Sequence, residues 1–340
     1  MIDNIRFTFE YNNDKEWLNS LKQNINLSKK FKNGNGSAYI GKLYFDVNRL
    51  NKKKIGSISN TKSSSLLIQI KEINSGICRI NIMNSMRKWY FYDSFYRDFT
   101  KKEFSNCMEL ISNKINVPLE VILESTVTRV EYGGNLNLRE SYKCFHNCIY
   151  SHKDLPKKVT YSGETLKFHG ENKKVIFYDK ITEHKNKDKI TAEVQKALNK
   201  KALSLRYEIS KTKIVKGDLE YKYMKRLGNI IEYWDNIADL WYNELDKIIF
   251  VNNMSPKIYD YLKDTQIKNM TEFLTYLGLE KLGIENLQTI LSDRALLKKR
   301  GILNKKYTEI FNKYKNLIEE EDFEYIFRQK VLQKRDEFKA

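Results

Sequence analysis

Residues 175–180 read Val175-Ile176-Phe177-Tyr178-Asp179-Lys180, and as a strand they would place Val175 and Phe177 on one face and Tyr178 and Lys180 on the other. The same design recurs at residues 127–131 (VTRVE) and 205–209 (LRYEI). Side chains at i and i+2 share one face of a strand. If the three strands are neighbours in one sheet, their polar faces form a single patch. That patch contains Arg129 with Glu131, Tyr178 with Lys180, and Arg206 with Glu208.

The pattern along the chain predicts two regions. From residue 2 to about residue 214, short alternating segments broken by turn residues indicate strands with intervening helices. After about Gly217 the segments lengthen and take helical periodicity, as in residues 223–248 and after Ser255-Pro256. We therefore predict an α+β fold, with an antiparallel-sheet catalytic domain over residues 1–215 and a mostly α-helical domain over residues 216–340.

Local signals predict several boundaries. Thr100 with Glu103 three residues later is a capping box at a helix start. The Asn-Gly pairs within residues 33–36 predict a turn, and Gly133-Gly134 predicts a strand end. The charged segment 180–204 is expected to be helical in its second half.

The charge balance predicts a polyanionic partner. Lys and Arg total 61 against 43 Asp and Glu, giving a net charge of +18 and a pI of about 9.4. Aromatic residues are interleaved with basic ones in residues 88–99, where rings could stack on unpaired bases or simply pack in the core. The sequence has neither the apolar stretch of a signal peptide nor a run of about 20 apolar residues, which predicts a cytoplasmic protein without a membrane span.

The residue inventory of the patch suits phosphodiester transesterification. A tyrosine hydroxyl, with a pKa near ~10, needs a metal ion or a cation that stabilises its phenolate. Carboxylates bind Mg²⁺ or Mn²⁺, which polarise a phosphate, and Lys180 and Arg206 would offset the remaining negative charge. The product would be a 5′-phosphotyrosine. The competing interpretation is a solvated ion-pair face worth about 0.2–1 kcal/mol per pair, and periodicity alone does not single out Tyr178 among 22 tyrosines.

Histidines and cysteines add weaker candidates. No His-apolar-His strand motif occurs, so any metal would rest mainly on carboxylates, with His184 beside Glu183 as an accessory ligand or proton shuttle. Cys144, His146 and Cys148 could hold zinc, but three clustered ligands without a fourth favour ordinary buried thiols.

These segments resemble the gene II/gene X family of phage and plasmid replication proteins. The start Met1-Ile2-Asp3 and residues 128–131, 176–183 and 205–208 are similar to family segments in their order and approximate spacing, with Glu131 where the family usually has Asp. The resemblance covers about residues 1–215. It implies that Tyr178 is the nucleophile, that Glu131, Glu183 and Glu208 are the leading ligands for Mg²⁺ or Mn²⁺, and that one tyrosine per subunit often requires a homodimer.

The expected function is therefore rolling-circle initiation, in which the protein nicks one strand of double-stranded origin DNA. A host DNA polymerase would extend the 3′-hydroxyl, and a host helicase would displace the strand, because the sequence has no phosphate-binding glycine loop. Three alternatives stay open. They are a non-enzymatic DNA-binding regulator, an RNA-binding protein, and a tyrosine recombinase, which would carry its tyrosine in a helical catalytic domain.

Overall fold

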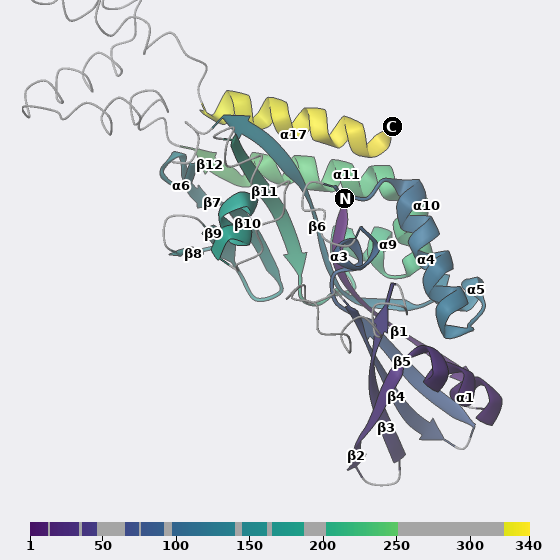
Figure 1. Ribbon diagram of the computed structural model, residues 1–340. Coiled ribbons are helices and arrows are strands. Elements are labelled where there is room, and N and C mark those ends of the chain that lie inside the picture. The colour runs from purple at the N-terminus through teal and green to yellow at the C-terminus, as the bar shows by residue number, and fades with distance from the viewer. Residues whose placement is uncertain are drawn as a thin grey trace, which may run out of the picture.

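The computed structural model describes residues 1–12, 14–33, 36–45, 65–74, 76–91, 97–139, 145–161, 165–186, 202–250 and 323–340. A ten-stranded antiparallel sheet runs through this part of the chain in the order β2-β3-β4-β5-β1-β6-β11-β10-β9-β8 (Figure 1). The predicted α+β class with an antiparallel sheet is confirmed. Among the described residues, no helix is long and apolar enough to cross a membrane.

The strands of the large sheet have the following bounds: β1 (Ile2–Asn12), β2 (Asn26–Asn33), β3 (Gly36–Tyr44), β4 (Ser65–Asn74), β5 (Ile77–Met83), β6 (Thr126–Arg139), β8 (Lys157–Tyr161), β9 (Thr165–His169), β10 (Lys173–Asp179) and β11 (Ala202–Lys211). A separate two-stranded sheet pairs β7 (Ile149–His152) with β12 (Ile248–Phe250). Strand β12 lies within the region that was predicted to be mostly helical.

The large sheet consists of two halves with the same topology, joined by the β1–β6 pair. In the first half the chain passes from β1 to the edge strand β2 and returns through β3, β4 and β5 to β1. In the second half it passes from β6 to the edge strand β8 and returns through β9, β10 and β11 to β6. Each strand of one half therefore has a topological counterpart in the other, which allows direct comparison of equivalent positions.

The described helices pack against this sheet. They are α1 (Lys15–Asn24), α3 (Met86–Tyr90), α4 (Lys101–Ile115), α5 (Leu119–Leu123), α6 (Phe145–Cys148), α7 (Lys180–Asn186), α9 (Leu219–Met224), α10 (Leu227–Glu232), α11 (Trp234–Asn243) and α17 (Phe323–Lys339), with a 3₁₀ turn at Glu244–Lys247. Helix α4 begins at the predicted capping box, because Thr100 and Glu103 each accept a hydrogen bond from the other's backbone N–H. In Figure 1, α11 and α17 lie side by side near β6 and β11.

Aromatic side chains join the helices to the sheet. The ring of Tyr207 in β11 stacks on Phe177 in β10 at 5.0 Å and lies 5.1 Å from the ring of Trp241 in α11. Tyr207 Oη donates to the Trp241 carbonyl, and Trp241 Nε1 donates back to the Tyr207 carbonyl, both at 3.3 Å. Phe327 of α17 packs on the same rings. The described helices after residue 216 thus share one hydrophobic core with the sheet.

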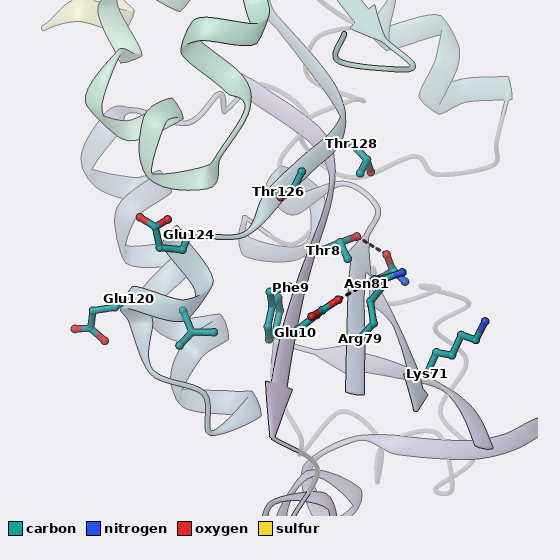
Figure 2. Close-up of a pocket in the computed structure, with 11 residues that line it drawn as sticks. Thr8, Phe9, Glu10, Lys71, Arg79, Asn81, Glu120, Glu124, Thr126 and Thr128 are labelled. Carbon is teal, nitrogen blue, oxygen red and sulfur yellow. Dashed lines mark hydrogen bonds and ion pairs between the residues drawn. The ribbon is translucent and has the colours of Figure 1, made fainter. Parts of the chain in front are cut away.

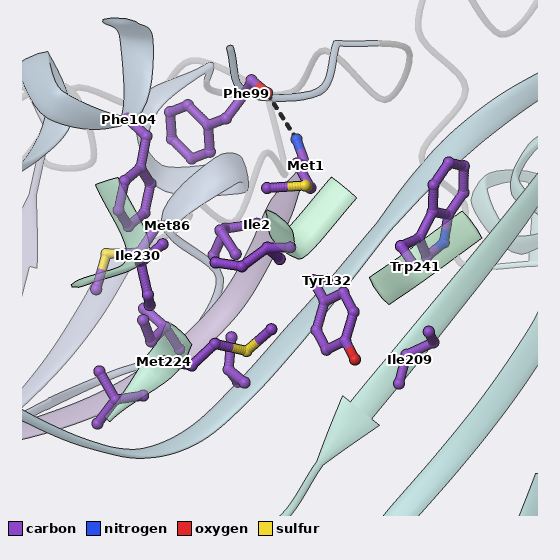
Figure 3. Packing of buried hydrophobic residues seen from close by; sticks show 14 of the residues in the cluster. Met1, Ile2, Met86, Phe99, Phe104, Tyr132, Ile209, Met224, Ile230 and Trp241 are labelled. Atoms are coloured by element: carbon purple, nitrogen blue, oxygen red, sulfur yellow. Dashed lines mark hydrogen bonds between the residues drawn. The ribbon is translucent and has the colours of Figure 1, made fainter. Parts of the chain in front are cut away.

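The start of β1 lies in this core as well. Met1 and Ile2 are fully buried, and the Met1 nitrogen donates to the Phe99 carbonyl at 2.6 Å (Figure 3). Tyr132 of β6 and Trp241 lie beyond them in the same close-up. Trp89 and Phe99, from the aromatic segment 88–99, are buried here, which favours core packing over base stacking for these two rings.

Two local predictions are wrong. Gly133-Gly134 does not end a strand but lies inside β6, because Gly133 opposes Glu208 where β6 and β11 approach so closely that a Cβ would lie 2.3 Å from the Tyr207 carbonyl oxygen. Lys180 does not continue the Tyr178 strand but begins α7. The strand ends because the Asp179 carboxylate accepts hydrogen bonds from the Ile181 N–H and the Thr182 hydroxyl, which starts a helix.

Other local predictions fall on parts of the chain that the structure does not describe. The turn residues Gly34 and Asn35, the second half of segment 180–204 and the start at Ser255-Pro256 all lie outside the described residues.

We predict that Gly133→Ala lowers the free energy of unfolding more than Gly134→Ala. The Cβ at residue 133 would collide with backbone, whereas at residue 134 it would meet side chains of Lys334, Phe338 and Trp241 at 3.0–3.2 Å, which can adjust. We expect about 1–3 kcal/mol for Gly134→Ala and a larger loss for Gly133→Ala. Urea denaturation of both variants measures the difference, and equal losses would contradict the assigned β6–β11 register.

Candidate functional site

The three strands predicted to form one polar patch are neighbours, in the order β6-β11-β10. Arg206 in the middle strand is paired with Tyr178 on one side and Asn135 on the other. These three residues share one cross-strand row, on the face opposite the Tyr207 and Phe177 rings. The sequence-based expectation that the polar faces lie together is confirmed.

The Arg206 guanidinium is fully buried and contacts three carboxylates. Its Nη1 lies 2.7 Å from Asp98 Oδ1, its Nη2 lies 3.1 Å from Asp3 Oδ2, and its Nε lies 3.0 Å from Glu208 Oε2. It also donates to the Asn135 side-chain oxygen at 3.2 Å. We call Arg206, Asp3, Asp98 and Glu208 the arginine cluster.

Two of these carboxylates, Asp3 and Asp98, were not among the site residues predicted from the sequence. Asp3 in β1 accepts a hydrogen bond from the Ser85 hydroxyl and lies 3.2 Å from Arg87 Nε in α3. Asp98, which precedes the α4 cap, accepts from the Asn135 N–H at 3.0 Å. Burial opposes ionisation of both carboxyls, but neighbouring arginines outweigh it and hold the pKa of Asp3 and of Asp98 well below its usual range.

Tyr178 lies half-buried beside the arginine cluster, with a cation next to its ring. The ammonium of Lys180 is 4.8 Å from the ring centroid and 2.9 Å from the Glu183 carboxylate. Burial lowers the pKa of Lys180 to about 8, although Glu183 acts in the opposite direction. Burial raises the pKa of Tyr178 well above its usual value, with the negative charge of Glu208 contributing and Arg206 opposing. The hydroxyl is therefore neutral in this state.

The three predicted metal ligands are not brought to one point. Glu183 is bound to Lys180, Glu208 to Arg206, and Glu131 to Arg129 and the Ser210 hydroxyl. In the described ranges, no group of three or more His, Cys, Asp or Glu side chains is positioned to hold a metal ion.

Two of the three are nevertheless close. Glu131 opposes Ser210 and Glu208 opposes Gly133, so the two carboxylates lie diagonally across β6 and β11. Burial raises the pKa of Glu208, and Asp3 and Glu131 add to this rise while Arg206 opposes it. A carboxyl group that is incompletely neutralised, next to a second carboxylate, fits Mg²⁺, which commonly binds one or two carboxylates together with substrate phosphate.

The remaining candidate ligands are placed as follows. His184 lies half-buried in α7 beside Glu183. Cys78, Cys107 and Cys148 are buried thiols, and Cys144 lies outside the described residues.

A groove lies in the first half of the sheet, next to the counterpart of the arginine cluster. It has a volume of about 980 Å³ and is lined by β1, β4, β5, α5 and the start of β6 (Figure 2). Arg79 here lies between Glu10 and Lys71, as Arg206 lies between Asn135 and Tyr178 in the second half. The Arg79–Glu10 pair is about half exposed. The groove thus contains an ordinary surface ion pair and no nucleophile equivalent to Tyr178.

Neither the protein-family models nor the curated proteins contain a match to this chain. The assignment of a function therefore depends on the residues themselves and on the resemblance of the segments around them.

We predict that Arg206→Leu lowers the free energy of unfolding by about 3–5 kcal/mol, because it leaves buried carboxylates without their cation. The matched control is Arg79→Leu at the equivalent position of the other half, where the exposed pair should cost less than about 1 kcal/mol. Chemical denaturation at neutral pH measures both. A loss for Arg206→Leu as small as that of the control would contradict a central role for the arginine cluster.

Proposed function

We propose that this protein is a rolling-circle replication initiator that nicks one strand of its replicon's origin DNA with Tyr178. The observation that carries the proposal is the position of Tyr178 in one cross-strand row with Arg206 and beside the buried ammonium of Lys180. A phenol in such surroundings can develop negative charge during attack on a phosphate. The resemblance to gene II/gene X proteins supports the same residue.

In the proposed reaction, Tyr178 Oη attacks the scissile phosphorus. A bond forms between the phenolic oxygen and phosphorus, and the bond from phosphorus to the 3′-oxygen breaks. The phenolic proton passes to Glu208, whose raised pKa makes it a better base than an ordinary carboxylate, and the 3′-oxygen takes a proton from water. Lys180 stabilises the charge on the phenolic oxygen, and Arg206 holds Glu208 in place.

A divalent cation belongs to this proposal. Glu131, next to Glu208, would hold Mg²⁺ or Mn²⁺, which supplies charge neutralisation at the scissile phosphate, while Glu208 remains available to accept the phenolic proton. Glu183 has a different role from the one expected of it, because it forms an ion pair with Lys180 and thereby keeps that ammonium beside Tyr178.

The products define the partners. The 5′-phosphotyrosine keeps the bond energy for later religation, and the free 3′-hydroxyl is a primer for a host DNA polymerase. A host helicase would displace the strand, and one tyrosine per subunit favours a homodimer at termination. The net charge of +18 favours binding to double-stranded origin DNA in the cytoplasm.

A non-enzymatic DNA-binding protein is the second candidate. The observation that favours it is the electrostatic balance at the site, because each predicted metal ligand is already bound to a basic residue and the pKa of Tyr178 is raised. The two candidates differ in whether a covalent adduct forms.

We predict that the wild-type protein nicks supercoiled plasmid carrying the native origin when Mg²⁺ or Mn²⁺ is present, and becomes covalently attached to the DNA. Tyr178→Phe should lose both activities because it lacks the attacking oxygen, whereas Tyr150→Phe, at an exposed tyrosine, should keep them. Gel mobility of the plasmid and protease-sensitive labelling of the 5′ end provide the readouts. Tight binding without cleavage by the wild type, with either metal, would favour the non-enzymatic candidate.

We also predict a bell-shaped pH dependence of the nicking rate. The rate should rise as Glu208 loses its proton, at a pH above the usual ~4.3 of a glutamate because its pKa is raised. It should fall above about pH 8, where Lys180 loses its charge. In Lys180→Arg the cation persists, so the fall should move to higher pH. If the fall of the nicking rate at high pH is unchanged in Lys180→Arg, deprotonation of Lys180 does not cause that fall.

A further inference from the structure

The exposed polar face of the second half of the sheet carries basic side chains next to the Tyr178 row. We call them the basic strip: Lys157, Lys167, Lys174, Arg129 and Arg6, with His169 among them. Lys157, His169 and Lys174 oppose one another across β8, β9 and β10. Arg129 and Arg6 oppose each other across β6 and β1. All six side chains are exposed or half-buried.

The strip has the length of a short nucleic-acid segment. From β8 to β1 it crosses six neighbouring strands, which at ~4.8 Å between strands gives about 24 Å. Its nearest member to the nucleophile is Lys167, which opposes Ile176, two residues from Tyr178 and thus roughly 7 Å along the strand. The strip therefore begins one row away from Tyr178.

The charges of the strip are poorly balanced within the protein. Glu131 is paired with Arg129, but within the described ranges Lys157, Lys167 and Lys174 form no ion pair. The pKa of Lys174 reflects this excess of positive charge, because burial and then the charges of Lys167 and Arg129 lower it. The charges of Lys157, Lys167 and Lys174 also act on His169. Cations gathered in this way repel one another until an anion is bound.

The other half of the same sheet shows that this clustering is not a general property of an exposed β-face. The row equivalent to His169, Lys174 and Ser210 consists there of Lys42, Leu67 and Met83. One cation replaces the basic cluster. The strip is thus concentrated in the half that contains Tyr178 and enters the other half only at Arg6 in β1.

We propose that the basic strip binds single-stranded DNA and positions the strand that Tyr178 attacks; the second part of this proposal rests on the proposed function. A single narrow line of cations fits one phosphate backbone, and the half-exposed Ile176 beside Lys167 offers an apolar surface to a base. The length of the strip corresponds to the lower end of the roughly 4–16 nucleotides that single-strand-binding domains cover. Strand separation at the origin would deliver such a segment.

The test is equilibrium binding of a fluorescein-labelled 12-nucleotide oligothymidine to the full chain in the Tyr178→Phe background. Anisotropy titrations between 50 and 200 mM salt compare this parent with the double variant Lys167→Gln/Lys174→Gln. Each phosphate contact to a single strand contributes about 0.7 to the slope of log K against log salt. Loss of two contacts should reduce the magnitude of the slope by about 1.4 and weaken binding at low salt.

The matched control is Lys42→Gln/Lys71→Gln, which removes the same charge from exposed lysines on the other half of this face. Its slope should equal that of the parent. Equal slopes for all three proteins, or equal reductions in both double variants, would overturn the proposal. So would a slope reduction in Lys167→Gln/Lys174→Gln that appears with a duplex of the same length but not with oligothymidine.

The proposal for the basic strip and the proposal for the nicking reaction can be refuted independently. Wild-type protein that forms the covalent adduct while Lys167→Gln/Lys174→Gln binds oligothymidine with an unchanged salt slope would refute the strip and leave the nicking function intact. A reduced slope in that variant, with no adduct from the wild type under any metal condition, would support the strip as a DNA-binding surface and refute the nuclease.

Discussion

The buried guanidinium of Arg206 is the interaction on which the rest of the site depends. Removal of a charge from water costs several kcal/mol even after relaxation, so a buried arginine persists only with carboxylates in good geometry around it. Its three partners come from β1, from the segment before α4 and from β11 itself. The ion pairs therefore fix the relative positions of segments that are about 100 residues apart in the chain.

A second buried ionic network holds the other end of the Tyr178 strand. Lys173, the first residue of β10, lies 2.7 Å from Glu244, which also accepts from His152 Nε2 at 3.0 Å. Burial opposes ionisation of Glu244, but its bonds to His152 and Lys173 lower its pKa to about 2. Because β10 is anchored at Lys173 and paired with Arg206 near its other end, the Tyr178 ring has little freedom to move along the sheet. A nucleophile benefits from such fixed placement, since misplacement by 1 Å can cost about 100-fold in rate.

Much of the sheet in this region could be predicted from alternation, whereas the arginine cluster could not. The sequences of residues 127–131, 175–180 and 205–209 are enough to predict which of their side chains lie on the same strand face, because this depends only on local periodicity. The roles of Asp3 and Asp98 depend on contacts with Arg206 over more than 100 residues, and neither position has a local signal. The metal-ligand prediction had the same limit. The resemblance implied Glu131, Glu183 and Glu208 as ligands, but only the fold shows that each is paired with its own cation.

The two errors arise from residues whose local preferences are changed by packing. Glycine pairs usually end strands because glycine is conformationally permissive, yet Gly133 is required inside β6 to let β11 approach. Lys180 follows the strand pattern by spacing, but the side chain of Asp179 provides the first hydrogen bonds of α7. The turn does not remove Lys180 from Tyr178. It places the ammonium over the ring face instead of two residues further along the strand.

Comparison of the two halves of the sheet separates the effect of residue type on the electrostatics of the site from the effect of burial. Both halves place an arginine at the same topological position with a carboxylate beside it, yet Arg79 and Glu10 are about half exposed while Arg206 is fully buried. Solvent screens the first pair, so it exerts little influence on its neighbours. The second pair acts in a low-dielectric environment and changes the pKa of Tyr178 and of Glu208. Only the arginine is common to both halves, because Glu10 opposite Arg79 is replaced by Asn135 opposite Arg206. The different electrostatic environment of the second half therefore follows from its burial by α3, α7 and the segment before α4, and from the carboxylates of Asp3, Asp98 and Glu208.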